Sequence, residues 1–597
     1  MCGIVGYTGL SIAFPILINA MSRVEYRGYD SCGIAILDSG KIQVAKSVGI
    51  VEELERKTQP FSGTIGIGHT RWATVGEPNE LNAHPHLDCA NEIAIVHNGE
   101  IENFLALKRF LENRGHSFQS DTDSEVLVHL IEEHGYSDLV RSVASALKEV
   151  EGSFALTVLQ KNSNKLVLAR RNSPLVLGVG DKENFVASDV PALLEKTNQV
   201  IYLEDGDLGI VSPETVHLWH NELPVFRKKH QIDWPLADLD KAGYPHYMLK
   251  EIFEQPRVIR DILTGKINDT RRVVTLEEKL NGGELPEKVI FLGCGSAYHA
   301  ALLGAHFFSE ISDCIVSANV ASEVDLRRSP RTKSWAVLLT QSGETIDTIS
   351  AARSAKSAGY FTIGITNNPD SSITRIIDQI IYTGAGLEVS VASTKTFISQ
   401  LIGIYLIGLN LFPPSQNVLH HLLGEIQLLP EKVQRVLGMT EEIKKVSRML
   451  ALYENVFFVG KGTSYPVALE GALKLKEIAY IHAEGYPAGE LKHGPFALLN
   501  ENTPVIAILP KDETYRRMFS TIKEIKARGA PVIVISNFED SEVNQLVDYV
   551  LQLPSTEPLF SPVIQSVALQ LLAYFCASER GFPIDRPRNL AKSVTVH

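Results

Sequence analysis

Residues 289–298 read VIFLGCGSAY, and residues 456–465 read VFFVGKGTSY, 167 positions further along the chain. Each segment is a short apolar run that ends in a glycine-containing turn, the pattern of a buried strand that leads into a helix. Two more pairs of strand-like runs follow in the same order: residues 335–340 and 504–509, then 361–366 and 531–536. Three matched strands in order indicate an internal repeat.

The sequence on either side of these strands has a helix-and-strand alternation. From about residue 250, helix-length segments alternate with short β-branched runs that end in Gly or Ser. This alternation is typical of βαβ units and a parallel sheet. We therefore predict two duplicated, doubly wound α/β units, at 281–420 and 450–580, followed by a C-terminal tail at 581–597.

The first 235 residues have a different character. Short apolar runs are broken by Gly and Asn, and helical patterns occur at 101–114 and 124–134. Such a mixture predicts an α+β layer structure. A polar, irregular stretch begins near residue 226, and we place the linker between the two halves at 236–280.

Composition restricts the class of protein. The 597 residues are enough for three or four folded units, and the 44% hydrophobic and 21% charged content is that of a globular protein. A net charge of -13 argues against a nucleic-acid or anionic-membrane surface. Six cysteines without a CxxC pair favour a reducing compartment, and no signal peptide is recognised, so we expect a cytoplasmic protein. The apolar run at 398–412 predicts a buried core helix.

Cys2 follows the initiator methionine directly. If Met1 is removed, one residue carries both a thiol and a free α-amine. Because that amine has a pKa of about 7.7–8, it is partly neutral near neutral pH and can act as the base for its own nucleophile. A cysteine at position 2 is by itself about as consistent with chance as with a catalytic role. Other segments of the sequence have to decide between the two.

Three such segments are Glu25–Ser31 (EYRGYDS), Gly68–Thr74 (GHTRWAT) and His97–Gly99 (HNG). In order and spacing they resemble the N-terminal-nucleophile glutamine amidotransferases across the first 235 residues. The resemblance implies an αββα sandwich in which Cys2 attacks the glutamine side-chain amide. It further implies an oxyanion hole from Asn98 and Gly99, glutamine binding by Arg71, Thr74, His84 and Asp123, and an ammonia gate at Trp72.

Several of these residues have ordinary alternatives. Asn-Gly is most often a hairpin turn, and a single Arg is usually a solvated charge. Val75 departs from the family pattern, which has His at this position, and this leaves the details of the glutamine-covering loop open. Cys32 and Cys89 have no supporting neighbours in the sequence and are expected to be packing residues.

The second half carries three turns rich in hydroxyl groups. They are Gly293–Ala297 (GCGSA), Thr340–Thr345 (TQSGET) and Val391–Lys395 (VASTK). Backbone N–H groups and hydroxyls after a strand can hold a phosphate without a cation. Taken alone, such turns are more often helix caps than ligand sites. The rival dinucleotide-binding pattern GxGxxG is absent.

Together these turns resemble the sugar isomerase domains of the glucosamine-6-phosphate synthase family, and the resemblance covers essentially the whole chain. It implies that Ser296, Thr340, Gln341, Ser342 and Thr345 bind the phosphate and the sugar, with Val391 and Ser393 contacting the sugar. Ala297 and Thr340 stand where the family often has Ser, so individual contacts stay open.

Residues Glu470, Lys474 and Glu477 are spaced by four and three positions, so on a helix they share one face. Such spacing usually marks an exposed, salt-bridged stripe, but the flanking sequence here is apolar. The resemblance implies that Glu477 moves protons between C1 and C2, that Glu470, Lys474 and Glu484 support the sugar, and that His493 assists ring opening. It also implies that Lys592, in a tail that closes the sugar site, forms a Schiff base with the ketose.

The resemblance thus implies conversion of glutamine and fructose 6-phosphate to glutamate and glucosamine 6-phosphate, the first step of hexosamine and UDP-N-acetylglucosamine synthesis. Ammonia would be channelled between the two sites. No cofactor or metal is expected. A homodimer is expected, with His493 supplied across its interface. Three rivals remain: another amidotransferase with the same glutaminase, a non-enzymatic sugar-phosphate sensor, and an isomerase that ignores glutamine.

Overall fold

The computed structural model describes residues 2–232, 240–268, 273–274, 285–326, 329–330, 332–369 and 371–594. The chain forms two compact units. One takes in the residues up to Asp240 and those from Ala591 onward, and the other spans Lys241–Leu590. The linker predicted at 236–280 lies partly outside the described residues, and the described part of it contains helix α6, Tyr247–Leu263.

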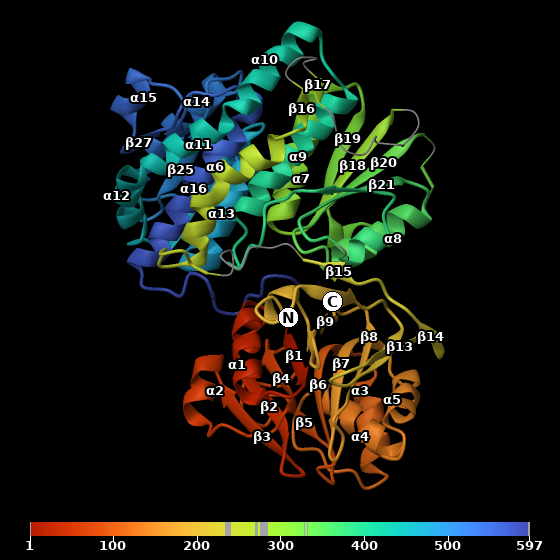
Figure 1. The fold of residues 1–597 in the computed structure, drawn as a ribbon. Coiled ribbons are helices and arrows are strands. Elements are labelled where there is room, and N and C mark those ends of the chain that lie inside the picture. The colour runs from red at the N-terminus through yellow and green to blue at the C-terminus, as the bar shows by residue number, and fades with distance from the viewer. Residues whose placement is uncertain are drawn as a thin grey trace. The chain divides into compact units, whose positions relative to one another are not determined.

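The first unit is built on two antiparallel sheets (Figure 1). The eight-stranded sheet has the order β15-β11-β9-β10-β1-β4-β2-β3. Its strands are β1 Gly3–Thr8, β2 Ser31–Asp38, β3 Lys41–Val48, β4 Ile65–Arg71, β9 Val176–Val179, β10 Asn184–Ala187, β11 Gln199–Tyr202 and β15 His230–Gln231. The seven-stranded sheet has the order β14-β13-β12-β8-β7-β6-β5. Its strands are β5 His86–Leu87, β6 Ile93–Ile101, β7 Gly152–Gln160, β8 Leu166–Arg171, β12 Asp207–Val211, β13 Val216–His220 and β14 Leu223–Val225.

The two sheets face each other across one apolar layer, in which Ile4 and Ile67 of the first sheet join Val96 and Leu168 of the second. Five helices cover the outer faces: α1 Ala13–Val24 and α2 Val51–Lys57 on the first sheet, and α3 Phe104–Glu112, α4 Glu125–Glu133 and α5 Leu139–Lys148 on the second. Because each sheet buries one face against the other sheet and one against helices, strands such as β4 are buried at every residue rather than at alternate residues. The αββα sandwich is thereby confirmed.

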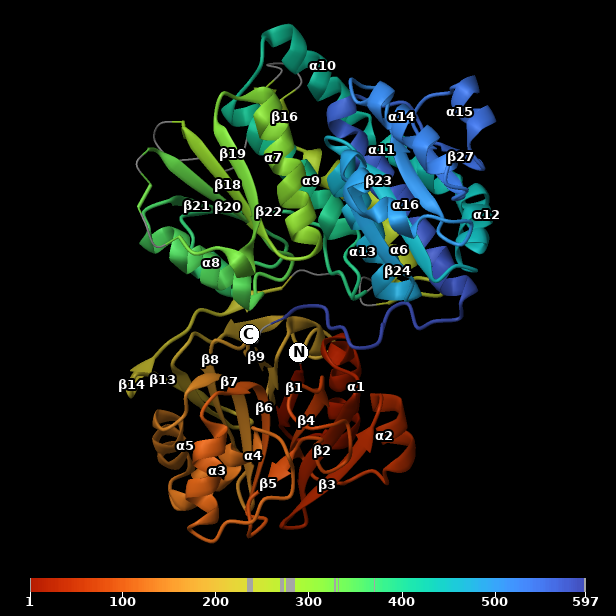
Figure 2. The ribbon, with the colours of Figure 1, turned by 180° about the vertical axis from the view of Figure 1, so that it is seen from behind.

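The second unit contains two five-stranded parallel sheets, seen from both sides in Figures 1 and 2. The first has the order β19-β18-β20-β21-β22, and the second has the order β24-β23-β25-β26-β27. Their strands are β18 Lys288–Gly293, β19 Ile315–Val320, β20 Ser334–Leu339, β21 Phe361–Thr366, β22 Gln379–Tyr382, β23 Asn455–Gly460, β24 His482–Pro487, β25 Val505–Leu509, β26 Val532–Ser536 and β27 Tyr549–Gln552. Both sheets therefore follow the order 2-1-3-4-5, which confirms the predicted duplication.

Helices connect and cover these strands. They are α7 Ser296–Ile311, α8 Ile346–Ser357, α9 Lys395–Leu411, α10 Gln416–Gln427, α11 Leu429–Gly438, α12 Thr440–Leu450, α13 Ser464–Ala479, α14 Tyr515–Lys526, α15 Ser541–Leu546 and α16 Ser561–Glu579. A short β16–β17 pair, Ile267–Asn268 with Val273–Val274, lies between α6 and β18.

One continuous core joins the two sheets of this unit through α6, α9 and α16. The run predicted as a core helix is α9, and it is buried along nearly its whole length. Within the described residues, the segment Pro558–Glu579 alone is long and apolar enough to cross a membrane by length and composition. Its most apolar stretch is 94% buried inside the unit, as expected for a core helix.

Candidate functional site

Cys2 lies immediately before β1, and its thiol meets the residue that follows β4. The backbone N–H of Trp72 donates to Cys2 Sγ at 3.3 Å, and the thiol donates to the Trp72 carbonyl at 3.5 Å. β1 and β4 are adjacent antiparallel strands with Gly3 opposite Thr70, so this register places Cys2 beside the end of β4. A side chain in place of Gly3 would bring a Cβ to 2.6 Å from Thr70 Oγ1, which explains the small residue next to Cys2.

Asn98, near the end of β6, is held in a dense network. Its Nδ2 donates to the Cys2 carbonyl and to Ser188 Oγ, both at 2.8 Å. Its Oδ1 lies 3.0 Å from His69 Nε2. Both amide hydrogens are thus engaged in this structure. Asn98 would stabilise an oxyanion by exchanging the bond to the Cys2 carbonyl for one to the substrate, which is common when catalytic contacts tighten on binding.

Gly99 has φ +134°, a backbone conformation that favours glycine. A Cβ at this position would lie 2.1 Å from the carbonyl oxygen of Ser153 on β7. The structure therefore requires glycine here, next to Asn98. No side chain of residue 99 itself covers its backbone N–H.

Arg71, the last residue of β4, is buried and faces the loop that follows it. Its guanidinium donates to the carbonyls of Val75 at 2.6 Å and Gly76 at 2.9 Å, with a longer bond to Glu77 at 3.4 Å. Val75 takes part through its backbone, so its departure from the family pattern leaves this contact intact. Asp30 braces the same loop by accepting from the Ala73 N–H at 2.8 Å.

The other residues expected to bind glutamine are placed differently. Asp123 is buried, and its Oδ2 accepts from the Ile101 N–H at 2.8 Å. Thr74 is exposed on the loop after β4. His84 is buried and packs edge-on against His69 and His86, with ring centroids 4.1 and 4.5 Å away. The structure thus gives His84 a supporting position beneath the Asn98 network.

This histidine row is neutral. His69 Nε2 lies 3.0 Å from two oxygens, those of His97 and Asn98, so it carries the proton and leaves Nδ1 to accept from His84 Nδ1 at 3.0 Å. Burial lowers the pKa of His69 to about 3, and burial also holds the pKa of His84 and His86 well below the usual value. The pKa of the Cys2 thiol is raised by burial, although the Trp72 N–H and the charges of Arg71 and Arg27 oppose the rise.

Two of the turns predicted to bind a sugar phosphate lie at one edge of the first parallel sheet. β18 and β20 are neighbours, and the order 2-1-3-4-5 reverses between them, which is where ligands bind in open α/β sheets. Ser296 begins α7 after β18, and residues 340–345 connect β20 to α8. The predicted phosphate turns therefore meet at the topological switch point.

The Thr340–Thr345 turn is preorganised by its own hydrogen bonds. Thr340 Oγ1 accepts from the Gly343 N–H at 3.2 Å and lies 3.5 Å from Thr345 Oγ1, while Ser342 Oγ accepts from the Glu344 N–H at 3.1 Å. Gln341 joins the turn to the next strand by accepting from the Asn367 N–H at 3.1 Å. Thr345 caps α8 by position but makes no side-chain cap bond, so its hydroxyl has capacity for a ligand.

The charged face of α13 packs against the start of α7. Glu470 accepts from Ser296 Oγ at 2.9 Å and from His299 Nδ1 at 2.7 Å. Lys474 Nζ lies 3.5 Å from Glu470 and 2.5 Å from Glu477. The exposed-stripe alternative is wrong, because Glu470 and Lys474 each retain only 1% of their side-chain exposure, whereas Glu477 keeps 20% and so faces the more open side.

The charges in this cluster stabilise one another. Burial alone would raise the pKa of Glu470, but Lys474, His299 and Ser296 outweigh it and hold the pKa below its usual value. Burial alone would lower the pKa of Lys474, but Glu477 and Glu470 outweigh it and raise the pKa. Lys474 is therefore an ammonium and Glu470 a carboxylate, and these two residues form a fixed pair of opposite charges.

Val391 and Ser393 lie in the loop before α9, where Val391 is buried and Ser393 Oγ is 2.9 Å from Thr396 Oγ1. Glu388 fixes this loop by accepting from the Thr394 and Thr396 N–H groups. Glu388 also lies close enough to raise the pKa of Lys474, which links the loop to the α13 cluster.

Among the residues that the structure describes, Glu484 and His493 share no hydrogen bond or ion pair with this cluster. Glu484, on β24, accepts a hydrogen bond from Tyr486 and lies 3.4 Å from His482 Nε2. His493 is exposed on the short helix that follows β24. Lys592 belongs to the segment that groups with the first unit. Their roles at the sugar stay predictions.

Some contributors were missed from the sequence. His299 lies one helical turn after Ser296, and that spacing could have identified it. Ser188 accepts from both the Ile4 N–H at 2.7 Å and Asn98, and it comes from a strand end far along the chain that no local pattern connects to Cys2. Cys32 is buried, as expected, but Cys89 is exposed, so the expectation that it packs in a core is wrong.

Comparison with known proteins agrees with this architecture. The glutamine amidotransferase domain model matches residues 61–211, and the SIS domain model matches residues 286–409 and 449–577. The solved C-terminal domain of glucosamine-fructose-6-phosphate aminotransferase from Francisella tularensis is 34% identical, with a TM-score of 0.55, and covers 58% of this chain and 100% of its own. Similar full-length proteins include the glutamine–fructose-6-phosphate aminotransferases (isomerizing) of Methanosarcina mazei (44% identical), Caldanaerobacter subterraneus (44%) and Pyrococcus horikoshii (43%), each matched over 100% of both chains. The chain belongs to the family of isomerizing glutamine–fructose-6-phosphate aminotransferases.

Proposed function

We propose that this enzyme converts fructose 6-phosphate and glutamine to glucosamine 6-phosphate and glutamate. Family membership over the full length supports the reaction. The observation that carries it to this chain's own residues is the buried Ser296–Glu470–Lys474–Glu477 cluster. It joins the two copies of the repeat beside the turns suited to phosphate.

In the glutaminase unit, Cys2 is the nucleophile once Met1 has been removed. Its α-amine accepts the thiol proton, and the thiolate attacks the side-chain amide carbon of glutamine. Asn98 Nδ2 and the Gly99 N–H stabilise the oxyanion that forms, and collapse of this intermediate releases ammonia and leaves a thioester that water hydrolyses to glutamate. Arg71 and Asp123 hold the α-carboxylate and α-ammonium of glutamine, and Thr74 and His84 support that site.

In the isomerase unit, the turn from Thr340 to Thr345 and Ser296 hold the phosphate and sugar, with Val391, Ser393 and Glu484 alongside. Lys592 forms a Schiff base with the open-chain ketose, ring opening being assisted by His493. Ammonia then replaces the lysine at C2, and Glu477 moves a proton between C1 and C2. The ammonium of Lys474, 2.5 Å from Glu477, keeps that carboxylate oriented until it accepts the proton.

Three finer features belong to the same proposal. Ammonia passes from the glutaminase to the sugar without escaping to water, where it would be protonated, and Trp72 gates its exit beside Cys2. The enzyme acts as a homodimer in the cytoplasm, with His493 supplied across the interface and the C-terminal tail closing the sugar site. Six free cysteines and a net charge of -13 support a reducing compartment and a protein that binds neither nucleic acid nor membrane.

The decisive experiment incubates the full chain with glutamine and fructose 6-phosphate and assays glutamate and hexosamine phosphate separately. Cys2→Ala should lose both products with glutamine yet make hexosamine phosphate from added ammonium. Glu477→Gln should still release glutamate but make no hexosamine phosphate. Glutamate release without hexosamine phosphate by the wild type would exclude the proposal and favour a sensor or another amidotransferase.

A further inference from the structure

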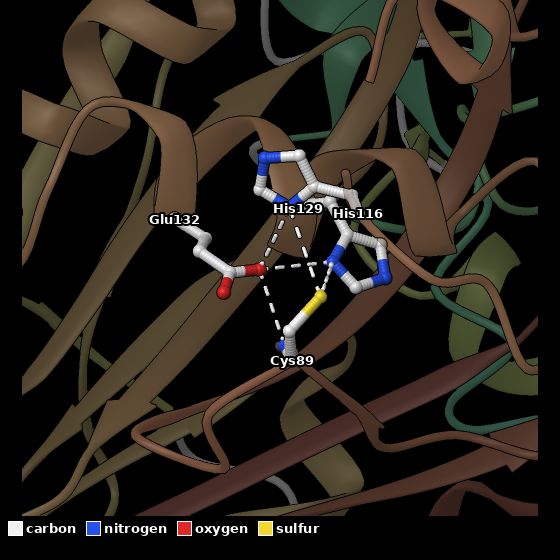
Figure 3. A group of neighbouring side chains, drawn as sticks. All are labelled: Cys89, His116, His129 and Glu132. Carbon is white, nitrogen blue, oxygen red and sulfur yellow. Dashed lines mark hydrogen bonds and ion pairs between the residues drawn. The ribbon is translucent and has the colours of Figure 1, made fainter. Parts of the chain in front are cut away.

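A second cluster of reactive side chains lies in the glutaminase unit, on elements distinct from those that hold Cys2. Cys89 is on the loop between β5 and β6, His116 follows α3, and His129 and Glu132 are on α4 (Figure 3). Each of these residues offers one atom to a common centre, and the four atoms lie within 4.8 Å of one another. Figure 3 shows the thiol, two imidazole nitrogens and one carboxylate oxygen facing inward.

The separations suit a tetrahedral metal ion. Cys89 Sγ is 3.5 Å from His129 Nδ1 and 3.8 Å from His116 Nδ1, and Glu132 Oε2 is 3.0 Å from each of those nitrogens. Around a tetrahedral Zn²⁺ with ordinary bond lengths, sulfur–nitrogen edges are about 3.6 Å and nitrogen–oxygen edges about 3.3 Å. All four atoms lie within 4.8 Å of one another, so a bound ion would shorten the widest pair by at most about 1.5 Å.

The outer nitrogens of both imidazoles are already oriented. His129 Nε2 lies 3.4 Å from Glu125 Oε1, and His116 Nε2 lies 3.1 Å from Glu133 Oε2. Metal-binding histidines in proteins usually donate their second N–H to a carboxylate in this way, which fixes the ring and turns the other nitrogen toward the metal. Glu125 is held in turn by the Gln119 and Ser120 N–H groups, at 2.7 and 2.6 Å.

A cation at the centre would fit these contacts. If each outer Nε2 carries its proton toward Glu125 or Glu133, both inner Nδ1 atoms present lone pairs to Glu132 Oε2 and to the sulfur. Lone pairs at 3.0 Å repel unless a proton or a cation lies between them.

We propose that Cys89, His116, His129 and Glu132 bind one divalent transition-metal ion of the zinc class. A single dication is balanced by the Cys89 thiolate and the Glu132 carboxylate, and binding releases the thiol proton to water. Thiolate with imidazole favours zinc-class ions over magnesium or calcium, which prefer oxygen alone. Because Cys89 is exposed, the ion can enter from solvent.

The ion would serve the fold rather than the reaction. It would tie the β5–β6 loop to α4 near the carboxyl end of that helix. Asp123 and Ser124 lie directly before the other end, where Ser124 Oγ is 2.8 Å from His97 Nδ1. None of the four proposed metal ligands has a role in the proposed reaction. The metal proposal can therefore fail without affecting the catalytic roles.

The test uses tag-free, full-length protein loaded with Zn²⁺ or with Co²⁺ as a spectroscopic probe. We expect one metal equivalent per chain by mass spectrometry, and a sulfur-to-cobalt charge-transfer band. Cys89→Ala and His116→Asn should lose both the bound metal ion and the charge-transfer band. Glu133→Gln, which removes only an outer carboxylate, should weaken Zn²⁺ binding about 10-fold or more.

Two matched variants separate this site from other cysteines. Cys2→Ala and Cys314→Ala each remove a partly exposed thiol outside the cluster, and both should keep the cobalt band and the metal equivalent. Loss of the band in Cys2→Ala with retention in Cys89→Ala would place the metal on the nucleophile and overturn the proposal. So would wild-type protein that binds no metal after incubation with excess Zn²⁺ and dialysis.

Discussion

Lys474→Met tests whether the charges on α13 act as one buried unit. The substitution keeps an unbranched side chain of similar length but removes the cation that lies 3.5 Å from Glu470 and 2.5 Å from Glu477. Breaking a buried ion pair by removing one partner typically costs about 3–5 kcal/mol. We expect the lower end, about 3 kcal/mol, because Ser296 and His299 continue to donate to Glu470.

The measurement is the thermal unfolding of the full chain, with glutamine hydrolysis assayed alongside. For the unit Lys241–Leu590, about 3 kcal/mol corresponds to a Tm lower by roughly 4 °C. Lys476→Met is the matched control, since Lys476 is exposed on the same helix and its loss should change the Tm by less than about 1 °C. Glutaminase activity should be unchanged in both variants, because Cys2 and its neighbours lie in the other unit.

The pH dependence provides a second readout. Without Lys474, burial should raise the folded-state pKa of Glu470 above its unfolded value, so the folded variant binds a proton that the unfolded chain releases. The deficit relative to the wild type should therefore shrink as the pH falls from about 8 to about 5. A Lys474→Met protein as stable as Lys476→Met, or a deficit that grows on acidification, would refute the buried-cluster reasoning.

Three further outcomes are expected. First, His69, His84 and His86 have folded pKa values below that of an unfolded histidine, so the free energy of unfolding should fall as pH drops below about 6.5, by about 1 kcal/mol per histidine per pH unit. Hydrogen exchange of the β4 amides at pH 7 and at pH 5.5 measures this fall. Unchanged protection would contradict neutral imidazoles. Second, Gly99→Ala should abolish glutamine hydrolysis while ammonium-dependent synthesis persists, since the added Cβ meets a β7 carbonyl at 2.1 Å; near-normal glutaminase kinetics would count against the required conformation. Third, Arg71→Lys should raise KM for glutamine about 10–100-fold, because lysine cannot replace the paired guanidinium bonds, and an unaltered KM would remove Arg71 from the glutamine site.

Much of the fold was predictable because the spacing of apolar residues along each segment indicates its strand or helix. Three strand pairs at a nearly constant offset predicted two parallel sheets, and the observed orders are identical in both. The most buried helix, α16, was not singled out, because an apolar run of that length reads the same whether it lies at the centre of a unit or at its edge. Its central position depends on packing against α11, α12 and α13, which lie far away in sequence.

Site residues were predictable where one element carries them. Glu470, Lys474 and Glu477 share a helix face by spacing alone, but their burial depends on Ser296 and His299, more than 170 positions earlier. The Cys89 cluster shows the same limit. Its ligands come from a loop, a turn and a helix separated by up to 43 positions, without the short CxxC or HxxxH spacing that marks a metal site in a sequence.

The duplication also supplies an internal comparison for the sugar site. Gly304 on α7 and Gly471 on α13 are equivalent, 167 positions apart, and each packs so closely that a Cβ would lie 2.8 or 2.9 Å from the phenyl ring of the equivalent strand residue, Phe291 or Phe458. In this register Glu470 and Lys474 correspond to Leu303 and Phe307, which are both core residues.

The same structural positions are thus apolar in one copy and charged in the other, although the backbone surroundings are alike. Packing is satisfied by Leu and Phe, and a buried ion pair is no more stabilising than such residues. Charge at these positions in the second copy therefore needs another reason than stability. The arrangement provides one, since α7 of the first copy brings its serine and histidine to the charged face of α13 of the second. In the proposed reaction, one copy supplies the turns for the phosphate and the other supplies the carboxylate that moves the proton, so neither copy alone contains both.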